Sequence, residues 1–177
     1  MIYITDLKII KIINIFVKIL LLLIISTFFM PFLSVSCDML NTEIRVSGIE
    51  MATVIRDFNQ AGNPAAFILI IPTVLLFVIS FIRLSAAAHA IFYITVSVIN
   101  TVIAFGIKLL IEIELYNRLS ANQFGEAFPF HDALKINIKT GFVLYIIFNI
   151  VLLFTGIALL IIFFHKTISE IRKTEID

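Results

Sequence analysis

Charged residues and cysteine are scarce in this sequence. Of its 177 residues, 14% are charged and 61% are hydrophobic, and the mean hydropathy is +1.13. Soluble domains are usually about half apolar and a quarter charged, so the composition excludes an ordinary soluble domain and indicates a membrane protein. The single cysteine, Cys37, excludes an internal disulfide and a Cys-x-x-Cys redox pair.

An excess of one charge sign and the common catalytic motifs are also missing. The 13 basic residues nearly balance the 12 acidic ones, and no Lys/Arg cluster indicates a nucleic-acid partner. There is no Walker loop, no Gly-x-Gly-x-x-Gly, no His-Glu-x-x-His and no Gly-x-Ser-x-Gly. The three histidines form no ligand set. We therefore predict no catalytic residues, no metal and no cofactor.

Long uncharged runs are what the sequence has instead. Four of them cover residues 19–36, 65–82, 84–107 and 140–164. Each is about as long as a helix that crosses a hydrocarbon core about 30 Å thick, and helices satisfy their own backbone groups there. We predict one all-α membrane domain over residues 1–177, a bundle of four transmembrane helices, with loops 37–64 and 108–139 on the same side.

The distribution of Lys and Arg predicts the orientation of these spans. One side would carry Lys8, Lys11, Lys18, Arg83, Lys166, Arg172 and Lys173. The other side, with much longer loops, would carry Arg45, Arg56, Arg118, Lys135 and Lys139. By the positive-inside rule both termini are expected in the cytoplasm and the two long loops outside. Near the N-terminus, polar residues recur at helical spacing and form one basic stripe, made of Lys8, Lys11, Asn14 and Lys18. Such a stripe suits an anionic leaflet, so membrane lipids are expected partners.

The first span could instead be a signal peptide with a lipid on Cys37. Lipoprotein processing favours an aliphatic residue three positions before the cysteine, where this chain has Ser34, and Lys18 lies well inside the segment. We therefore favour an uncleaved helix.

The first outer loop contains a helix start. Ser47 and Glu50 stand three residues apart, as in a capping box. Met51, Val54 and Phe58 then recur at helical spacing, and the preceding "TEIRVS" alternates like a strand. We predict an exoplasmic cap made of a short strand and an amphipathic helix. In the second loop, "IELYNRLSA" is expected to prolong the third helix.

Each predicted span contributes a polar residue to one level of the membrane. Thr27, Thr73, Asn100 and Asn149 each lie seven to nine residues from the outer end of their span, which is roughly 10 to 14 Å along a helix. In one interpretation Asn100 and Asn149 hydrogen-bond to hold the helices together, while the two threonines bond to backbone carbonyls of their own helices. In the other, the layer is the floor of a pocket that opens outward.

Two ionisable residues stand just above this layer. Lys108 and Glu112 are one turn apart on the third span. An ionisable group near the apolar zone is a candidate site, but a lysine there can also extend its ammonium to the outer headgroups.

Three short motifs resemble a pattern in small four-span bacterial inner-membrane proteins. They are "MPFLSVSC", "VSGIEMA" and, at the start of the last span, "KTGFVLY". The resemblance implies a four-helix fold and the bacterial cytoplasmic membrane, and it implies no activity. Members often have Trp after the proline, where this chain has Phe32. The layout is also similar to that of claudin-type proteins, by analogy only, since their loop cysteines and Trp signature are missing.

These observations predict a non-enzymatic membrane interaction or accessory protein, whose partner is another membrane protein or the protein itself. The alternative is a small transporter, channel, or lipid- or small-molecule-binding protein with a site open to the exoplasmic side. A membrane enzyme is the least expected class, because no acid–base or nucleophile set converges.

Overall fold

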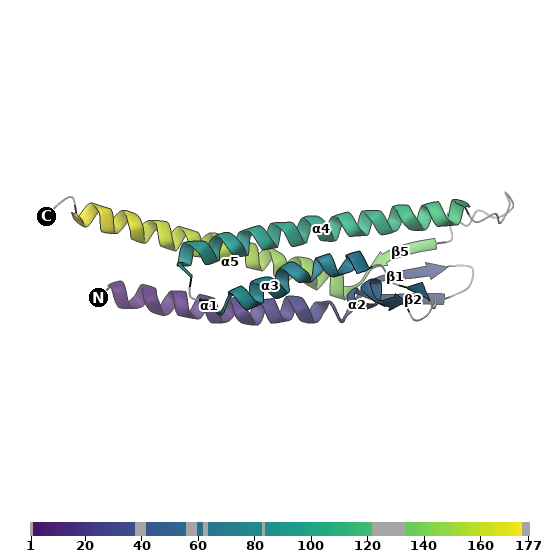
Figure 1. The fold of residues 1–177 in the computed structure, drawn as a ribbon, viewed down its shortest axis with the longest axis horizontal. Helices are drawn as coiled ribbons and strands as arrows, with labels where there is room; N and C mark the ends of the chain where they lie inside the picture. The colour runs from purple at the N-terminus through teal and green to yellow at the C-terminus, as the bar shows by residue number, and fades with distance from the viewer. Residues whose placement is uncertain are drawn as a thin grey trace.

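The protein is mostly helical in a computed structural model, which describes residues 2–37, 42–55, 60–61, 64–82, 84–121 and 134–174. The long helices are α1 (Ile2–Thr27), α4 (Ala86–Ala121) and α5 (Thr140–Thr174) (Figure 1). Within these residues, three stretches are long and apolar enough to cross a membrane, namely Ile9–Thr27, Ala86–Leu110 and Thr140–Ser169. These helices support the prediction of a helical membrane protein.

The helices run along the long axis of the molecule, and both termini lie at the same end (Figure 1). α5 packs against α4 and α1. The contact with α4 is close at Gly156, where an added Cβ would lie 2.9 Å from Ile94 Cγ1 and 3.1 Å from the Ala90 carbonyl oxygen. Glycine therefore allows the two helix backbones to approach one another.

The second uncharged run forms a broken helix. A 3-10 helix, η2 (Pro64–Leu69), is followed by α3 (Ile71–Ile79). Pro72 stands in the first turn of α3, where its missing N–H costs no hydrogen bond. The apolar helical segment Ala66–Ile79 is shorter than the other three. The structure thus has three helices of spanning length in its described residues, where the sequence predicts four.

The first span ends earlier than predicted. α1 stops at Thr27 rather than near residue 36, and a turn leads into strand β1 (Pro31–Cys37). The residues after Phe32 alternate between apolar and small polar side chains, which is the period of a strand with two different faces. The sequence predicts a membrane helix here because these residues are uncharged, and an uncharged run also fits a membrane helix.

Three strands form an antiparallel sheet at the end of the molecule opposite the termini (Figure 1). β1 is central, between β2 (Thr42–Ser47) and β5 (Leu134–Ile138). The strand predicted from "TEIRVS" is confirmed as β2. The sequence did not predict β5, which pairs with β1 across about a hundred residues of chain. The predicted extension of the third helix is confirmed, because α4 continues to Ala121.

The sheet has one polar and one apolar face. The register places Ser34 opposite both Arg45 and Asn137, and Ser36 opposite Glu43. Residues directly opposite one another share a face. The other face carries apolar residues such as Leu33 and Val46, which are both buried.

The capping box predicted at Ser47 is present and starts a short helix, α2 (Gly48–Ala52). The predicted continuation to Phe58 is wrong, because α2 ends at Ala52. Val54 and Ile55 instead form β3 (Val54–Ile55), which pairs with β4 (Gln60–Ala61), and Phe58 lies outside the described residues. β-branched residues favour strands over helices. An added Cβ on Gly48 would lie 2.5 Å from the Phe28 ring, so α2 lies directly on the end of α1.

Candidate functional site

A polar cluster ties three helical segments together inside the bundle. Asn100 of α4, Asn149 of α5 and Thr73 of α3 are all fully buried. The Asn100 Nδ2 group donates to Thr73 Oγ1 at 2.7 Å and to Asn149 Oδ1 at 3.0 Å. The Asn100 amide nitrogen therefore donates one proton to a side chain of α3 and the other to a side chain of α5.

The hydrogen bonds around Asn149 determine the orientation of both amides. Asn149 Nδ2 donates to the Tyr145 carbonyl at 2.8 Å. A carbonyl can only accept, so the nitrogen of Asn149 must point at Tyr145 and its Oδ1 must point at Asn100. Asn100 must then present its own nitrogen. In addition, Ser97 Oγ donates to the Asn149 carbonyl.

Tyr145 extends the cluster to the break in the second apolar run. Its hydroxyl donates to the Leu69 carbonyl at 2.7 Å, and the residue is almost completely buried. Leu69 ends η2, so its carbonyl lies where regular helical bonding is interrupted. Sequence reasoning missed Tyr145. Its position four residues before Asn149 was the available signal, since residues at i and i+4 share one helix face.

Thr27 lies outside this cluster and bonds to its own helix, as the first interpretation of the layer predicts for both threonines. Its predicted depth of nine residues below the end of the span is wrong, because α1 ends at Thr27 itself. The Thr27 side chain is buried, and its hydroxyl donates to the Ile24 carbonyl of its own helix at 2.7 Å. Of the four residues in the predicted layer, hydrogen bonds join Thr73, Asn100 and Asn149.

Lys108 and Glu112 both lie on α4, beyond the cluster. Lys108 is eight residues after Asn100, which is about 12 Å along the helix axis, and it is half-buried. The side chain of Glu112 lies outside the described residues.

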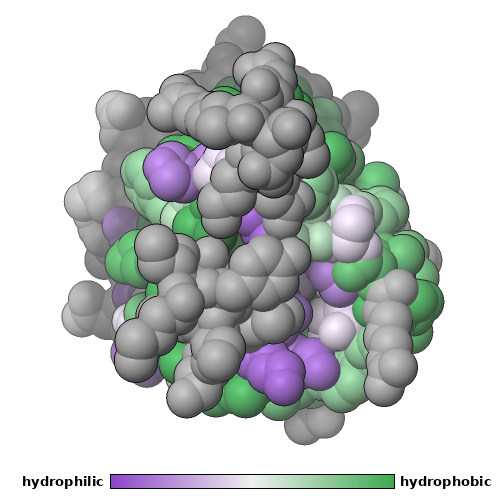
Figure 2. Space-filling view, turned by 90° about the vertical axis from the view of Figure 1, so that its left-hand side faces the viewer, coloured by the Kyte–Doolittle hydropathy of each residue, from purple (hydrophilic) through white to green (hydrophobic). Residues whose placement is uncertain are grey.

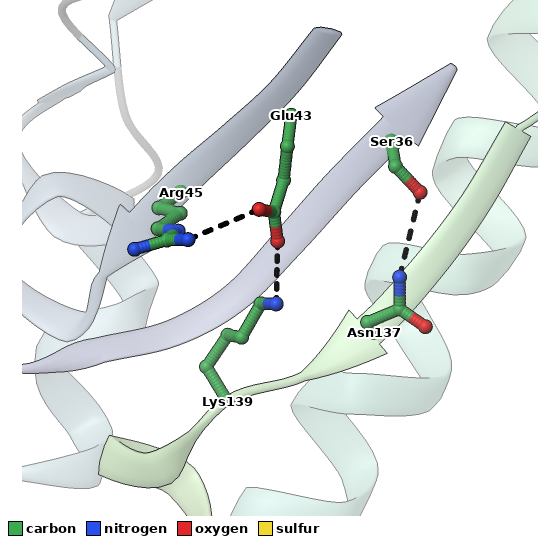
Figure 3. A network of polar contacts seen from close by, with 5 residues as sticks. All are labelled: Ser36, Glu43, Arg45, Asn137 and Lys139. Carbon is green, nitrogen blue, oxygen red and sulfur yellow. Dashed lines mark hydrogen bonds and ion pairs between the residues drawn. The ribbon is translucent and has the colours of Figure 1, made fainter. Parts of the chain in front are cut away.

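A second polar network lies on the sheet outside the bundle (Figure 3). Lys139, directly after β5, reaches across β1 and forms an ion pair with Glu43 of β2. Arg45 Nη2 donates to the same carboxylate at 3.2 Å. On the neighbouring strands, Asn137 Nδ2 is 3.4 Å from Ser36 Oγ. The network thus joins all three strands through side chains.

This network keeps Glu43 ionised. The contact with Lys139, which is the largest cause, and the hydrogen bond from Arg45 lower the pKa of Glu43 from 4.5 to about 2. Next to the network, the capping box brings Ser47 N within 2.8 Å of Glu50 Oε2 and Glu50 N within 3.3 Å of Ser47 Oγ. Both features are polar structure at the end of the molecule opposite the termini.

Within the residues that the structure describes, no three His, Cys, Asp or Glu side chains lie together as metal ligands. His89 is buried at the start of α4, where its ring stacks on Tyr93 with centroids 5.8 Å apart. The amide and hydroxyl groups inside the helices can hydrogen-bond to one another and hold the helices together, or they can hydrogen-bond to a ligand.

No protein-family model matches this chain, and no curated protein and no solved structure is significantly similar to it.

Proposed function

We propose that this chain is a four-pass protein of the bacterial cytoplasmic membrane that acts as an interaction or accessory protein rather than as an enzyme. The observation that carries the proposal is the Thr73–Asn100–Asn149 cluster, in which polar groups bind one another across helices. Such contacts contribute roughly 0.6 to 2 kcal/mol each in a membrane. They make the bundle a rigid support for surfaces that bind other membrane components.

The length of the broken helix supports the fourth pass. A 3-10 helix rises about 2.0 Å per residue and an α-helix about 1.5 Å. The six residues of η2 and the nine of α3 therefore extend over roughly 25 Å, close to the 30 Å of a hydrocarbon core. A break inside a membrane is tolerated where neighbouring groups satisfy the backbone, and the Tyr145 hydroxyl does so for Leu69.

The surface also fits a bilayer. Large apolar side chains are exposed on every long helix, for example Phe16 on α1, Phe105 on α4 and Phe154 on α5. Seen from the end that carries the termini, hydrophobic residues surround scattered hydrophilic ones (Figure 2). Together with the distribution of Lys and Arg, this arrangement supports cytoplasmic termini and an exoplasmic sheet.

One observation favours the alternative, a small transporter, channel or lipid- or small-molecule-binding protein. Asn100 Oδ1 is buried and has no hydrogen-bond partner among the described residues. It lies next to the break between η2 and α3, and transporters often build their sites at broken helices. In this alternative the cluster would bind a group that donates a hydrogen bond to Asn100.

The two functions differ in the effect of removing the amides. The variants are Asn100→Leu, Asn149→Leu and the double variant, with the exposed Thr95→Leu on α4 as the control for adding leucine. If the amides serve only each other, each single change leaves a buried polar group unpaired and costs about 1 to 2 kcal/mol. The double change should then be less destabilising than the sum of the two single changes.

Thermal unfolding in mild detergent measures these differences. A double variant whose loss of stability equals or exceeds the sum of the two single losses would contradict the pairing role. If both single variants kept the stability of the parent, the alternative would be favoured, because a wet site can satisfy the remaining amide with water.

A further inference from the structure

α5 carries a continuous row of exposed, large apolar side chains, here called the α5 stripe. Its members follow one another at alternating spacings of four and three residues. They are Val143, Ile147, Ile150, Phe154, Ile157, Ile161, Phe164 and Ile168, and the same spacing continues to Ile171. Their exposed fractions range from 38% at Ile157 to 64% at Phe154. This spacing is the heptad repeat of a coiled coil.

The opposite side of α5 makes the contacts within the protein. Tyr145, Asn149, Leu152 and Leu159 are all buried against the other helices. The α5 stripe is therefore a second apolar surface, separate from the core. No Asp, Glu, Lys or Arg occurs from Val143 to His165, and the first charged residue is Lys166, which is not a member of the stripe.

Lipid tails can cover only part of this stripe. The 35 residues of α5 extend over about 52 Å, whereas the hydrocarbon core is about 30 Å thick. If the core begins where α5 begins, beside Lys139, it ends close to Leu159. Phe164 and Ile168 then lie at the level of the headgroups or beyond, beside His165 and Lys166. In Figure 1 this part of α5 extends past the start of α4.

We infer that the α5 stripe binds the same stripe of a second copy of this chain, as a parallel pair of helices. This inference rests on the proposed membrane orientation, because two copies inserted in the same sense hold their α5 helices parallel. A parallel pair brings each member of the stripe against its own equivalent, so apolar residues meet apolar residues along the whole length.

The available area fits this occupant. Eight side chains with about half of their surface exposed present roughly 800 Å² per copy, which is the contribution of one partner to a standard interface. Inside the core the association is driven by packing. At Phe164 and Ile168 it also removes apolar surface from contact with water and headgroups.

Disulfide cross-linking in native membranes tests the inference, with Cys37→Ser as the background because Cys37 is the only cysteine. Ile168→Cys places a thiol in the stripe, and Ser169→Cys places one at the same depth on an exposed position outside it. A disulfide needs Cα atoms within about 7 Å of each other. We expect the cross-linked dimer fraction of Ile168→Cys to be several times that of Ser169→Cys.

Equal cross-linking of the stripe and control positions, or none at either, would overturn the pairing of α5. The Ser169→Cys variant also reports orientation, because an impermeant thiol reagent should label it only after the cells are opened. Failure of the cross-link with correct labelling refutes the α5 pair alone. Labelling of Ser169→Cys in intact cells refutes the proposed orientation, on which the pair depends.

Discussion

Ser47 shows how one side chain determines where an element begins. It occupies the N-cap of α2, and the reciprocal bonds with Glu50 satisfy backbone donors that the first turn would otherwise leave unpaired. The same residue ends β2. Ser47 therefore marks the point at which the chain leaves the sheet and begins α2, which packs on the end of α1.

Replacing Ser47 with Ala should cost about 0.5 to 2 kcal/mol, the usual value for the loss of an N-cap. We expect faster proteolysis within residues 37–64 without loss of membrane insertion. The exposed Thr53→Ala is a suitable control, because Thr53 lies at the other end of α2. Limited proteolysis of membrane vesicles measures the difference, and an unchanged cleavage rate in Ser47→Ala would show that the cap does not hold this loop.

Glu43 gives the sheet a dependence on pH. Its pKa is lowered from 4.5 to about 2 in the folded protein, so its contribution to stability is present above pH 4.5 and is lost as the pH falls through 2. Since both partners are partly exposed, salt should weaken the effect.

We expect the thermal stability of the parent in detergent to fall between pH 4.5 and 2 more steeply than that of Glu43→Gln. Lys139→Met should raise the pKa of Glu43 and move the loss to higher pH, because Lys139 is the largest cause of the shift. If parent and Glu43→Gln gave parallel pH profiles, the ion pair would contribute nothing to stability.

At the scale of elements, α3 is the segment whose form depends most on its neighbours. Its apolar sequence suits a membrane helix, but Pro72 restricts where a regular helix can begin. The resulting break at Leu69 is acceptable because α5 supplies the Tyr145 hydroxyl. The break and its partner thus form a single structural unit, made from residues 76 positions apart in the chain.

The sheet is likewise an element that one segment cannot form alone. β1 pairs with the nearby β2 and with the distant β5, and Lys139 fastens the outer two strands through Glu43 (Figure 3). Since Lys139 is followed directly by α5, the sheet also fixes where the last helix begins. The end of the helices next to the sheet is therefore held by backbone pairing and by the Glu43–Lys139 ion pair.

At the scale of the whole molecule, both termini lie at the end opposite the sheet (Figure 1). The proposed four passes require this arrangement, and the distribution of Lys and Arg is the reason for the proposed cytoplasmic location of the termini.

Thiol labelling of intact cells should therefore modify Cys37 with an impermeant reagent. In a Cys37→Ser background, a cysteine introduced at position 173 by Lys173→Cys should be labelled only after the membrane is opened with detergent. The reverse pattern would contradict the orientation. Intact mass of the purified protein provides a further check, because lipid attachment at Cys37 requires a mature chain that starts there.

The sequence by itself determined the membrane class, the three long helices, strand β2 and the capping box at Ser47. These features depend on composition and on short-range periodicity, which act within one segment. Asn100 and Asn149 could be selected for the same reason, since a polar residue in a long apolar run is conspicuous wherever it points.

Only the tertiary structure decided the features that depend on distant partners. The end of α1 at Thr27 follows from β1 pairing with β2 and β5, and an apolar run without charge fits a helix as well as a buried strand. Val54 and Ile55 form a strand rather than the predicted helix because they pair with Gln60 and Ala61. Tyr145 entered the polar cluster because the break after η2 offered a carbonyl. Hydrogen bonds between segments decided each of these cases, and local sequence does not encode where the partner will be.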